Sequence, residues 1–246
     1  MWTGRVQIFM TWLWLLAAAI PAAPLAIQDA ITADELIEKH VAAVGGREAL
    51  EKVTSTVMTG SFELPAMGAS GTITMYAKAP NKRMTVINVD GFGEIFQGFD
   101  GERGFSVSPM GSIDMTGQML EDMKRDSLLH PELQWKQIYP KIEIKGKGKA
   151  GERDAWIVVM TPEKGSPVTA HFDAETFLML KTSAVRMTDQ GEAEIETEFG
   201  DYREVADTGM KAPHLIKQKM PVGEIITRIT EIQTNVDIPD SKFAKP

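Results

Sequence analysis

The chain has 246 residues, of which 43% are hydrophobic and 24% are charged, and it contains no cysteine. The absence of cysteine excludes a thiol nucleophile, a disulfide framework, a cysteine-ligated zinc or iron–sulfur site, and a lipid-modified N-terminal cysteine. The formal net charge is −8, with no basic stripe, which argues against a nucleic-acid partner. This length and composition predict a globular protein with a core of its own.

The N-terminus has the layout of a secretory signal peptide. One positive charge, Arg5, precedes an apolar stretch over residues 6–20, and small residues and prolines follow as far as Ala26. We expect residues 1–26 to be a signal peptide that is cleaved after Ala26. The alternative is an uncleaved anchor, because the apolar stretch and the residues after it are just long enough to span a bilayer. Both interpretations place the remainder of the chain outside the cytoplasm.

A helix is predicted directly after this leader. Thr32 and Glu35 have the spacing of a capping box, in which each side chain accepts a hydrogen bond from a free backbone N–H at the helix start. Apolar residues then repeat at helical spacing until the glycine pair Gly45 and Gly46, which predicts the end of the helix. A second, short helical segment is expected over residues 47–53.

From Thr54 onward the hydrophobic period changes from about 3.6 residues to 2, which is typical of strands. The predicted strands are 72–76, 82–89, 155–160, 168–173, 178–185, 192–199 and 224–232. Their close spacing leaves no room for crossover helices, so the strands are expected to be antiparallel. One helix, over residues 117–129, interrupts them. Because no linker or internal repeat is visible, we expect one domain over residues 27–246.

The sequence offers little catalytic chemistry. The segment 146–151 matches the glycine-rich dinucleotide fingerprint, but a strand pattern follows it where phosphate binding needs a helix start, so a hairpin is expected. The four histidines lie far apart without metal-ligand spacing, and no serine-nucleophile motif occurs. The alternating glutamates of 192–198 predict a solvated strand face, with a cation site as the alternative. We therefore expect no enzyme, no cofactor and no metal site.

Methionine is abundant, with 15 residues in the chain. Its flexible side chain suits either an apolar surface that adapts to several shapes or the gaps of an ordinary core. An antiparallel sheet that curls without closing leaves a concave face that a helix can cover. The residues expected to line such a cavity are Met75, Met84, Ile95, Trp156, Val158 and Met179, and those expected on the covering helix are Met119, Leu120 and Met123. A different strand register would invert half of the wall residues.

Several segments resemble the periplasmic lipoprotein carriers and their LolA/LolB-like relatives. Residues 71–83, with their Lys-x-Pro turn, and residues 98–105, with their Asp-Gly hairpin, carry the resemblance. The glycine-ended first helix, the segment 151–180 and the ending 238–243 are similar to the broader group of outer-membrane lipoprotein-sorting proteins. The resemblance implies a mainly β (α+β) fold: an incomplete antiparallel β-barrel whose concave face is covered by helices and holds acyl chains or another lipid.

Two positions depart from the family pattern. In the lipoprotein carriers, the residue directly before the turn proline is an arginine. In that family this arginine holds the lid shut. Here that position is Ala79, and Arg83 lies three residues beyond the proline. The aromatic residue after Asp-Gly, usually tryptophan, is Phe105. A chain without cysteine also cannot be a lipid-anchored acceptor of the LolB kind, which leaves a soluble carrier.

The expected function is that of a non-enzymatic periplasmic carrier that binds lipid or the acyl chains of lipoproteins for transfer between envelope membranes. Its expected partners are this cargo and transport proteins of the inner or outer membrane. The alternative is a non-enzymatic envelope module for protein interaction or assembly, whose concave face is filled by its own side chains. An enzyme would require histidines and carboxylates that are distant in sequence to converge in one cleft.

Overall fold

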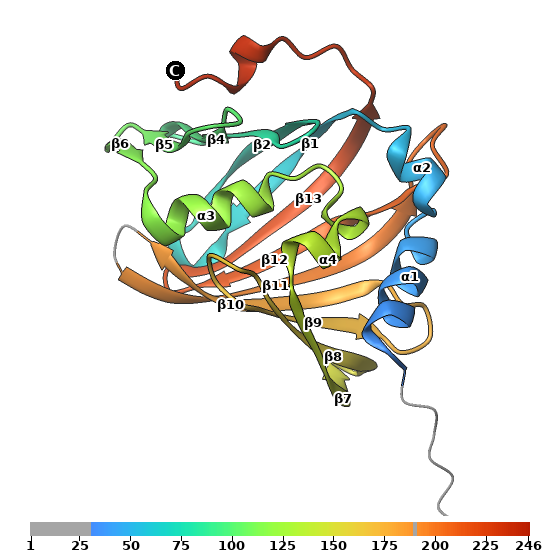
Figure 1. The fold of residues 1–246 in the computed structure, drawn as a ribbon. Coiled ribbons are helices and arrows are strands. Elements are labelled where there is room, and N and C mark those ends of the chain that lie inside the picture. Colours follow the sequence, from blue (N-terminus) through green and yellow to red (C-terminus); the bar gives the residue numbers. More distant parts are fainter. Residues whose placement is uncertain (1–30, 189–190) are drawn as a thin grey trace, which may run out of the picture. The chain divides into compact units, whose positions relative to one another are not determined.

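A single antiparallel sheet of thirteen strands dominates the computed structural model, which describes residues 31–188 and 191–246 (Figure 1). The described residues belong to one compact unit, Ile31–Pro246. The signal peptide predicted over residues 1–26 lies outside the described residues, so it stays a prediction, as does the domain boundary at residue 27.

Two helices, α1 (Ala33–Ala43) and α2 (Arg47–Glu51), precede the sheet. The capping box predicted at the start of α1 is confirmed. The Thr32 hydroxyl accepts a hydrogen bond from the Glu35 backbone N–H at 3.2 Å, and the Glu35 carboxylate accepts one from the Thr32 backbone N–H at 2.8 Å. These contacts satisfy two of the N–H groups that every helix start leaves without an intrahelical partner.

Two meanders of strands follow, separated by short helices. The first meander consists of β1 (Ser55–Leu64), the 3-10 turn η1 (Pro65–Met67), β2 (Ala69–Lys78), β3 (Lys82–Val89), β4 (Gly93–Phe99), β5 (Gly104–Ser108) and β6 (Gly111–Asp114). The helical segment contains α3 (Gly117–Asp126), η2 (Pro131–Leu133) and α4 (Trp135–Ile138). The second meander consists of β7 (Lys141–Ala150), β8 (Arg153–Thr161), β9 (Val168–Asp173), β10 (Met179–Thr188), β11 (Gly191–Glu204), β12 (Lys211–Met220) and β13 (Gly223–Thr234), and the 3-10 turn η3 (Asp240–Phe243) follows it.

The pairing of β1 with β13 joins the two meanders into one sheet, in the order β6-β5-β4-β3-β2-β1-β13-β12-β11-β10-β9-β8-β7. Within the described residues, the edge strands β6 and β7 are not paired with each other, so the sheet curves without closing. The predicted fold class, a mainly β (α+β) incomplete antiparallel barrel, is confirmed. The glycine-rich segment 146–151 forms the β7–β8 hairpin, as predicted.

The helices lie on the hollow side of the curved sheet. Figure 1 shows α3 between β4 and β5 on one side and β10 and β11 on the other, with α1 and α4 nearer β7 to β9. The predicted helix over 117–129 ends earlier, at Asp126. The Leu129 backbone N–H donates to the Pro80 carbonyl oxygen at 3.2 Å, outside the helix, so residues 128–129 do not continue the α-helical hydrogen bonds. The Ser127 backbone N–H closes the last turn on Met123.

The main core lies between α1, α4 and the strands β8 and β9. Leu36, Val158 and Phe172 are almost completely buried there. The imidazole of His40 packs between Trp135 and Phe172, with ring centroids 5.9 and 5.1 Å away. Its Nδ1 lies 2.9 Å from the Phe177 carbonyl oxygen, to which it donates a hydrogen bond. This end of the hollow is therefore filled by the protein's own side chains.

The buried His40 predicts a pH-dependent contribution to stability. Burial lowers the pKa of the imidazole below its ordinary value of 6.5, more than the Phe177 carbonyl and the Glu132 carboxylate raise it. The unfolded chain then binds the proton more readily, so the contribution is complete above about pH 6.5 and is lost as the pH falls toward the folded-state pKa. We expect His40→Asn, which keeps a donor for Phe177, to show a shallower decline. Urea unfolding at pH 7.5 and 5.5 measures this, and equal declines in both proteins would contradict it.

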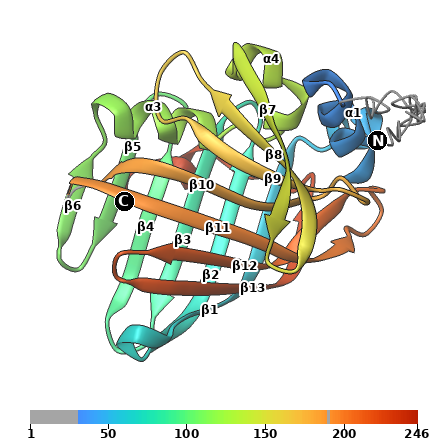
Figure 2. The same cartoon turned by 90° about the horizontal axis from the view of Figure 1, so that it is seen from below.

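A second core lies on the opposite face of the first meander. After β13, the chain returns over β1 to β5, where Ile238 and Phe243 pack against Met84 and Phe105 (Figures 1 and 2). Lys78 and Lys82 both pair with Asp240 and hold the same segment. The outer face of this meander is therefore covered by the C-terminal segment.

The position of Met84 corrects one prediction. Met84 is the partner of Tyr76 across β2 and β3, whereas Met75 is the partner of Thr85. Because successive residues of a strand point to opposite faces, Met84 and Met75 lie on opposite sides of the sheet. Met84 belongs to the core under the C-terminal segment, so its assignment to the concave wall was wrong. An apolar partner outside the strands, residues 236–243, accounts for its burial.

Candidate functional site: the concave face and its covering helix

The first meander presents a row of apolar side chains on its inner face. Ile73, Ile87 and Ile95 are directly opposite one another on β2, β3 and β4. Met75 shares their face, two residues along β2. Ile73 is buried, while the other three are only half-buried. The same face carries Arg83, which contacts α3, so this row faces the covering helix.

The second meander presents a matching row. Ile195 of β11 is the partner of Ala184 of β10, and Phe199 of β11 is the partner of Ile216 of β12. Ile225 of β13 continues the same face beside β12. All five side chains are half-buried. The curved sheet therefore presents partly exposed apolar side chains toward α3 from both of its halves.

The apolar side of α3 completes this surface. Leu120 lies against Gly104 of β5, so closely that a Cβ added at Gly104 would meet the Leu120 side chain at 3.3 Å. The Ser127 hydroxyl donates a hydrogen bond to the Met123 sulfur at 3.5 Å. Met119, Leu120 and Met123, the residues predicted on the covering helix, all lie on α3 and are partly exposed.

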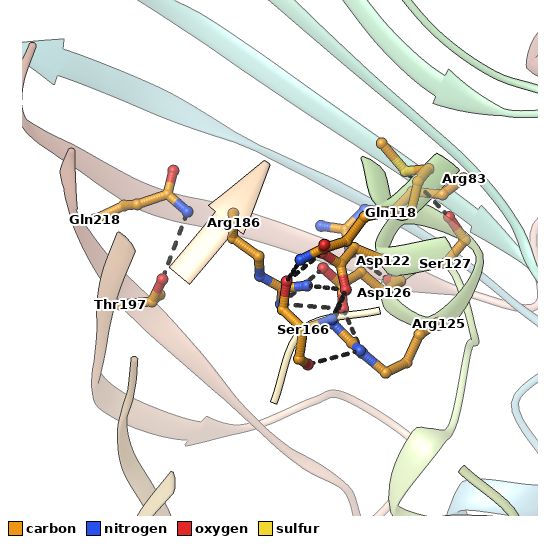
Figure 3. A network of polar contacts seen from close by, with 11 residues as sticks. Arg83, Gln118, Asp122, Arg125, Asp126, Ser127, Ser166, Arg186, Thr197 and Gln218 are labelled. Atoms are coloured by element: carbon orange, nitrogen blue, oxygen red, sulfur yellow. Dashed lines mark hydrogen bonds and ion pairs between the residues drawn. The ribbon is translucent and has the colours of Figure 1, made fainter. Parts of the chain in front are cut away.

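A buried polar network holds the other side of α3 (Figure 3). The Asp122 carboxylate accepts hydrogen bonds from the Ser166 backbone N–H and hydroxyl, both at 2.7 Å. It also pairs with Arg125 of the same helix at 2.8 Å and with Arg186 of β10 at 2.9 Å. Gln118 donates to the Ser166 hydroxyl at 2.8 Å. The helix is thus connected to the β8–β9 loop and to β10 at once.

The balance of these contacts keeps Asp122 ionised. Burial alone would raise the pKa of its carboxyl group, but the two hydrogen bonds from Ser166 and the charges of Arg186 and Arg125 outweigh burial. The pKa of Asp122 consequently lies below its ordinary value. A charged aspartate that is buried with two arginines and a serine forms a rigid attachment point.

The C-terminal end of α3 is attached to the first meander as well. Arg83 of β3 donates a hydrogen bond to the Asp126 carbonyl oxygen at 2.9 Å, and the Asp126 carboxylate pairs with Arg186 at 3.2 Å. Ala79 stands directly before the turn proline Pro80, and the arginine that contacts the helix, Arg83, lies four residues later. Arg83 and Arg186 together connect α3 to both halves of the sheet.

The predicted wall residues fall into three groups. Met75 and Ile95 lie on the open part of the concave face. Trp156, Val158 and Met179 belong to the core beneath α1 and α4, where Val158 is 1% exposed. Met84 lies on the far face, as described above.

Sequence reasoning missed the anchoring residues Asp122, Ser166 and Arg186. The spacing of Asp122 and Arg125, three residues apart on a predicted helix, was a visible signal of an ion pair. Nothing in the sequence indicated that Ser166 and Arg186 would join them.

Two solvent-open hollows lie elsewhere on the described surface. One, of about 350 Å³, is lined by residues of β11 to β13 that include Asp201 and His214, and the other, of about 400 Å³, lies beside Glu194 and Lys219. Neither is lined by the predicted cavity residues. Among the residues that the structure describes, no group of three histidines or carboxylates is placed to bind a metal ion, and no helix is long and apolar enough to span a membrane.

Comparisons with known proteins identify the fold. No protein-family model matches the chain, and no curated protein matches its sequence. A LolA superfamily protein from Nitrosomonas europaea matches in structure with a TM-score of 0.56 and 15% identity, over 88% of this chain and 99% of that one. A DUF1329 family protein from Desulfovibrio piger matches with a TM-score of 0.56 and 12% identity, over 86% and 96%.

A third solved structure matches over a similar length. A domain from Vibrio parahaemolyticus, described provisionally as an outer membrane lipoprotein-sorting protein domain, has a TM-score of 0.50 and 12% identity, over 84% of this chain and 97% of that one. At these identities the comparisons establish the fold alone. The chain has a LolA-like fold, in agreement with the resemblance seen in its sequence.

Proposed function

We propose that this chain, with its LolA-like fold, is a non-enzymatic carrier that binds lipid or the acyl chains of lipoproteins on the concave face beneath α3. The observation that supports the proposal most directly is the pair of half-buried apolar rows, around Met75 and Ile95 on one meander and around Phe199 and Ile216 on the other. These side chains are partly exposed to water. An apolar ligand that displaced this water would therefore bind with a favourable hydrophobic free energy.

The hydrophobic free energy available at such a site is sufficient to bind a lipid. Burying one methylene contributes about 0.8 kcal/mol, so an acyl chain of about twelve methylenes contributes on the order of 10 kcal/mol before the cost of ordering. Apolar sequestration of this kind needs no catalytic group. The proposal extends to transfer between envelope membranes, with export by the predicted signal peptide, a periplasmic location and transport proteins of the inner or outer membrane as partners.

Release of the ligand requires α3 to move. The helix is attached by Asp122, Asp126 and their arginine and serine partners. Its apolar side can therefore separate from the sheet only if these contacts break or if the helix rotates about them. A membrane protein that receives the cargo would supply the energy for this step. The half-buried Met119 and Met123 would then lie at the opening.

The carrier proposal predicts a lipid that copurifies with the protein. We expect native mass spectrometry of the protein, purified from the cell envelope without detergent, to detect a bound mass in the lipid range. Met75→Asp should lose that mass, because a carboxylate on the concave face opposes an apolar ligand. The matched control is Val185→Asp, which adds the same charge on the opposite, exposed face of β10 and should retain the lipid. Extraction and lipid analysis then identify the cargo.

The alternative, a module for protein interaction with a self-filled concave face, is favoured by the core beneath α1 and α4, where Val158 is buried and the half-buried Trp156 packs against the core. It predicts a protein without bound lipid, whose melting temperature does not change when lipids are offered. That result, with wild type and Met75→Asp behaving alike, would overturn the carrier proposal.

A further inference from the structure

Among the residues that the structure describes, four of the seven large exposed apolar side chains lie in hairpin turns. Met67 is 69% exposed in the β1–β2 turn, Phe92 is 43% exposed in the β3–β4 turn, Met110 is 86% exposed in the β5–β6 turn, and Val222 is 49% exposed in the β12–β13 turn. Ile113, Val185 and Met187 are also exposed and lie on strands next to such turns. We refer to Met67, Phe92, Met110 and Val222 as the apolar rim.

The strand pairing places all four turns at the same end of the strands, which we call here an edge of the sheet, as distinct from its edge strands β6 and β7. In a meander, alternate turns share an edge, so the β1–β2, β3–β4 and β5–β6 turns lie together. Glu63, near the end of β1, is the partner of Ile226, near the start of β13, which brings the β12–β13 turn to that edge too. Both cartoon views place these turns on the left-hand side, away from α1 and α2 (Figures 1 and 2).

Neighbouring turns of the rim are in contact. A Cβ added at Gly93 would meet the Pro109 ring at 3.2 Å, which places the β3–β4 turn against the β5–β6 turn. A Cβ added at Gly223 would meet the Ala66 side chain at 2.8 Å, which places the β12–β13 turn against the β1–β2 turn. The exposed side chains therefore form an arc around one end of the curved sheet and do not belong to unrelated loops.

The form of this arc fits a lipid interface better than a folded partner. Each apolar side chain projects singly from a tight turn. Apart from the adjacent residues of the chain, nothing lies within 4 Å of a Cβ built at Gly68, Gly91 or Gly111 in three of these turns. Separate projections can enter a fluid that closes around them, whereas a rigid protein partner favours a continuous, well-packed patch. Exposed side chains of this size otherwise carry a solubility cost.

The charges beside the rim indicate which lipid surface it can approach. Glu63, Asp90, Glu94 and Glu224 lie within a few residues of the turns. The nearby cations Lys219 and Arg186 are already paired, with Glu196 and Asp122 respectively. An anionic membrane would repel this edge, because the chain as a whole carries a net charge of −8. Neutral headgroups impose no such penalty.

We propose that the apolar rim docks the protein on a bilayer surface with neutral headgroups, with Met67, Phe92, Met110 and Val222 in the interface. Docking in this way does not require that the concave face bind lipid. It orients the end of the sheet that lies away from α1 and α2 toward the membrane.

Sedimentation with phosphatidylcholine vesicles tests the proposal, with the protein used as the cell produces it. We expect the wild type to bind, and the variant Met67→Ser/Phe92→Ser/Met110→Ser/Val222→Ser, which has the same net charge, to bind at least tenfold more weakly. Equal binding of the two proteins, or no binding of the wild type, would overturn the proposal. Phosphatidylglycerol vesicles should bind the wild type less well at low salt, and stronger binding there would also contradict it.

A fluorescence measurement keeps the test independent of the fourfold variant. Met110→Trp places a reporter in the rim, and Ala206→Trp places the matched reporter in the exposed β11–β12 turn at the opposite edge. Brominated phosphatidylcholine should quench only the first. Equal quenching of both would contradict docking by the rim. Met75→Asp should bind vesicles like the wild type, so loss of bound cargo and loss of docking remain distinguishable.

Discussion

Replacing Asp122 by alanine is expected to destabilise the protein by about 3–5 kcal/mol and to free α3 from the sheet. The substitution leaves the buried Arg125 and the half-buried Arg186 with only the more exposed Asp126 as a carboxylate partner, and it leaves the Ser166 backbone N–H without its acceptor. An uncompensated buried charge costs more than the ion pair contributed, because the desolvation of the partner is no longer offset.

Two measurements check this expectation. Urea unfolding gives the change in free energy, and hydrogen exchange of the amides in 117–126 reports whether α3 opens before the sheet unfolds. Glu121→Ala is the matched control on the same helix, because Glu121 pairs with Lys124 near the surface and should contribute less than about 1 kcal/mol. Equal effects of the two substitutions would show that the Asp122 network does not hold the helix.

Phe243→Ala is expected to cost about 3–5 kcal/mol, the usual cost of removing a buried phenylalanine side chain. Phe243 is 0% exposed, and with Ile238 it fills the space over Met84 and Phe105 on the outer face of the first meander. Its removal leaves a cavity that the sheet cannot close, since the strand backbone is fixed by its hydrogen bonds on both sides.

The melting temperature provides the readout for this substitution. For a domain of this size, 1 kcal/mol corresponds to about 2–4 °C, so a fall of roughly 6–20 °C is expected. Lys245→Ala is the control from the same segment, because Lys245 pairs with the exposed Asp114 and should change stability by less than about 1 kcal/mol. A similar small shift for both variants would mean that the C-terminal segment adds little to the core.

The sequence predicted correctly those features that depend on residues close together in the chain, such as helix starts and the alternation of strand faces. The capping box at Thr32 and Glu35 specified where α1 begins, because its hydrogen bonds join residues three apart. The alternation of residues 192–199 placed the glutamates and the apolar residues on opposite faces of β11. The structure has Glu196 beside Lys181 and Lys219 on one face and Ile195 on the other.

The face of Met84 could not be predicted in the same way. A hydrophobic period of two shows that successive side chains of a strand point to opposite faces of the sheet. It does not show which of the two faces is covered by other parts of the chain. β3 carries apolar residues on both faces, with Met84 and Val86 on one and Ile87 on the other. Burial of the first face comes from residues 236–243, which are distant in the sequence and show no strand pattern of their own.

The sequence by itself determined an antiparallel, mainly β chain with a capped first helix and one separate internal helix, which it predicted over 117–129. These properties follow from hydrogen-bond and side-chain periods within a few residues. Only the tertiary structure decided which faces are filled, which are open and where α3 is attached. Asp122 and Ser166 meet across 44 residues, and the rim unites four turns from both meanders. Such contacts depend on how the strands are ordered in the sheet, because sheet order brings distant residues together and no local pattern specifies it.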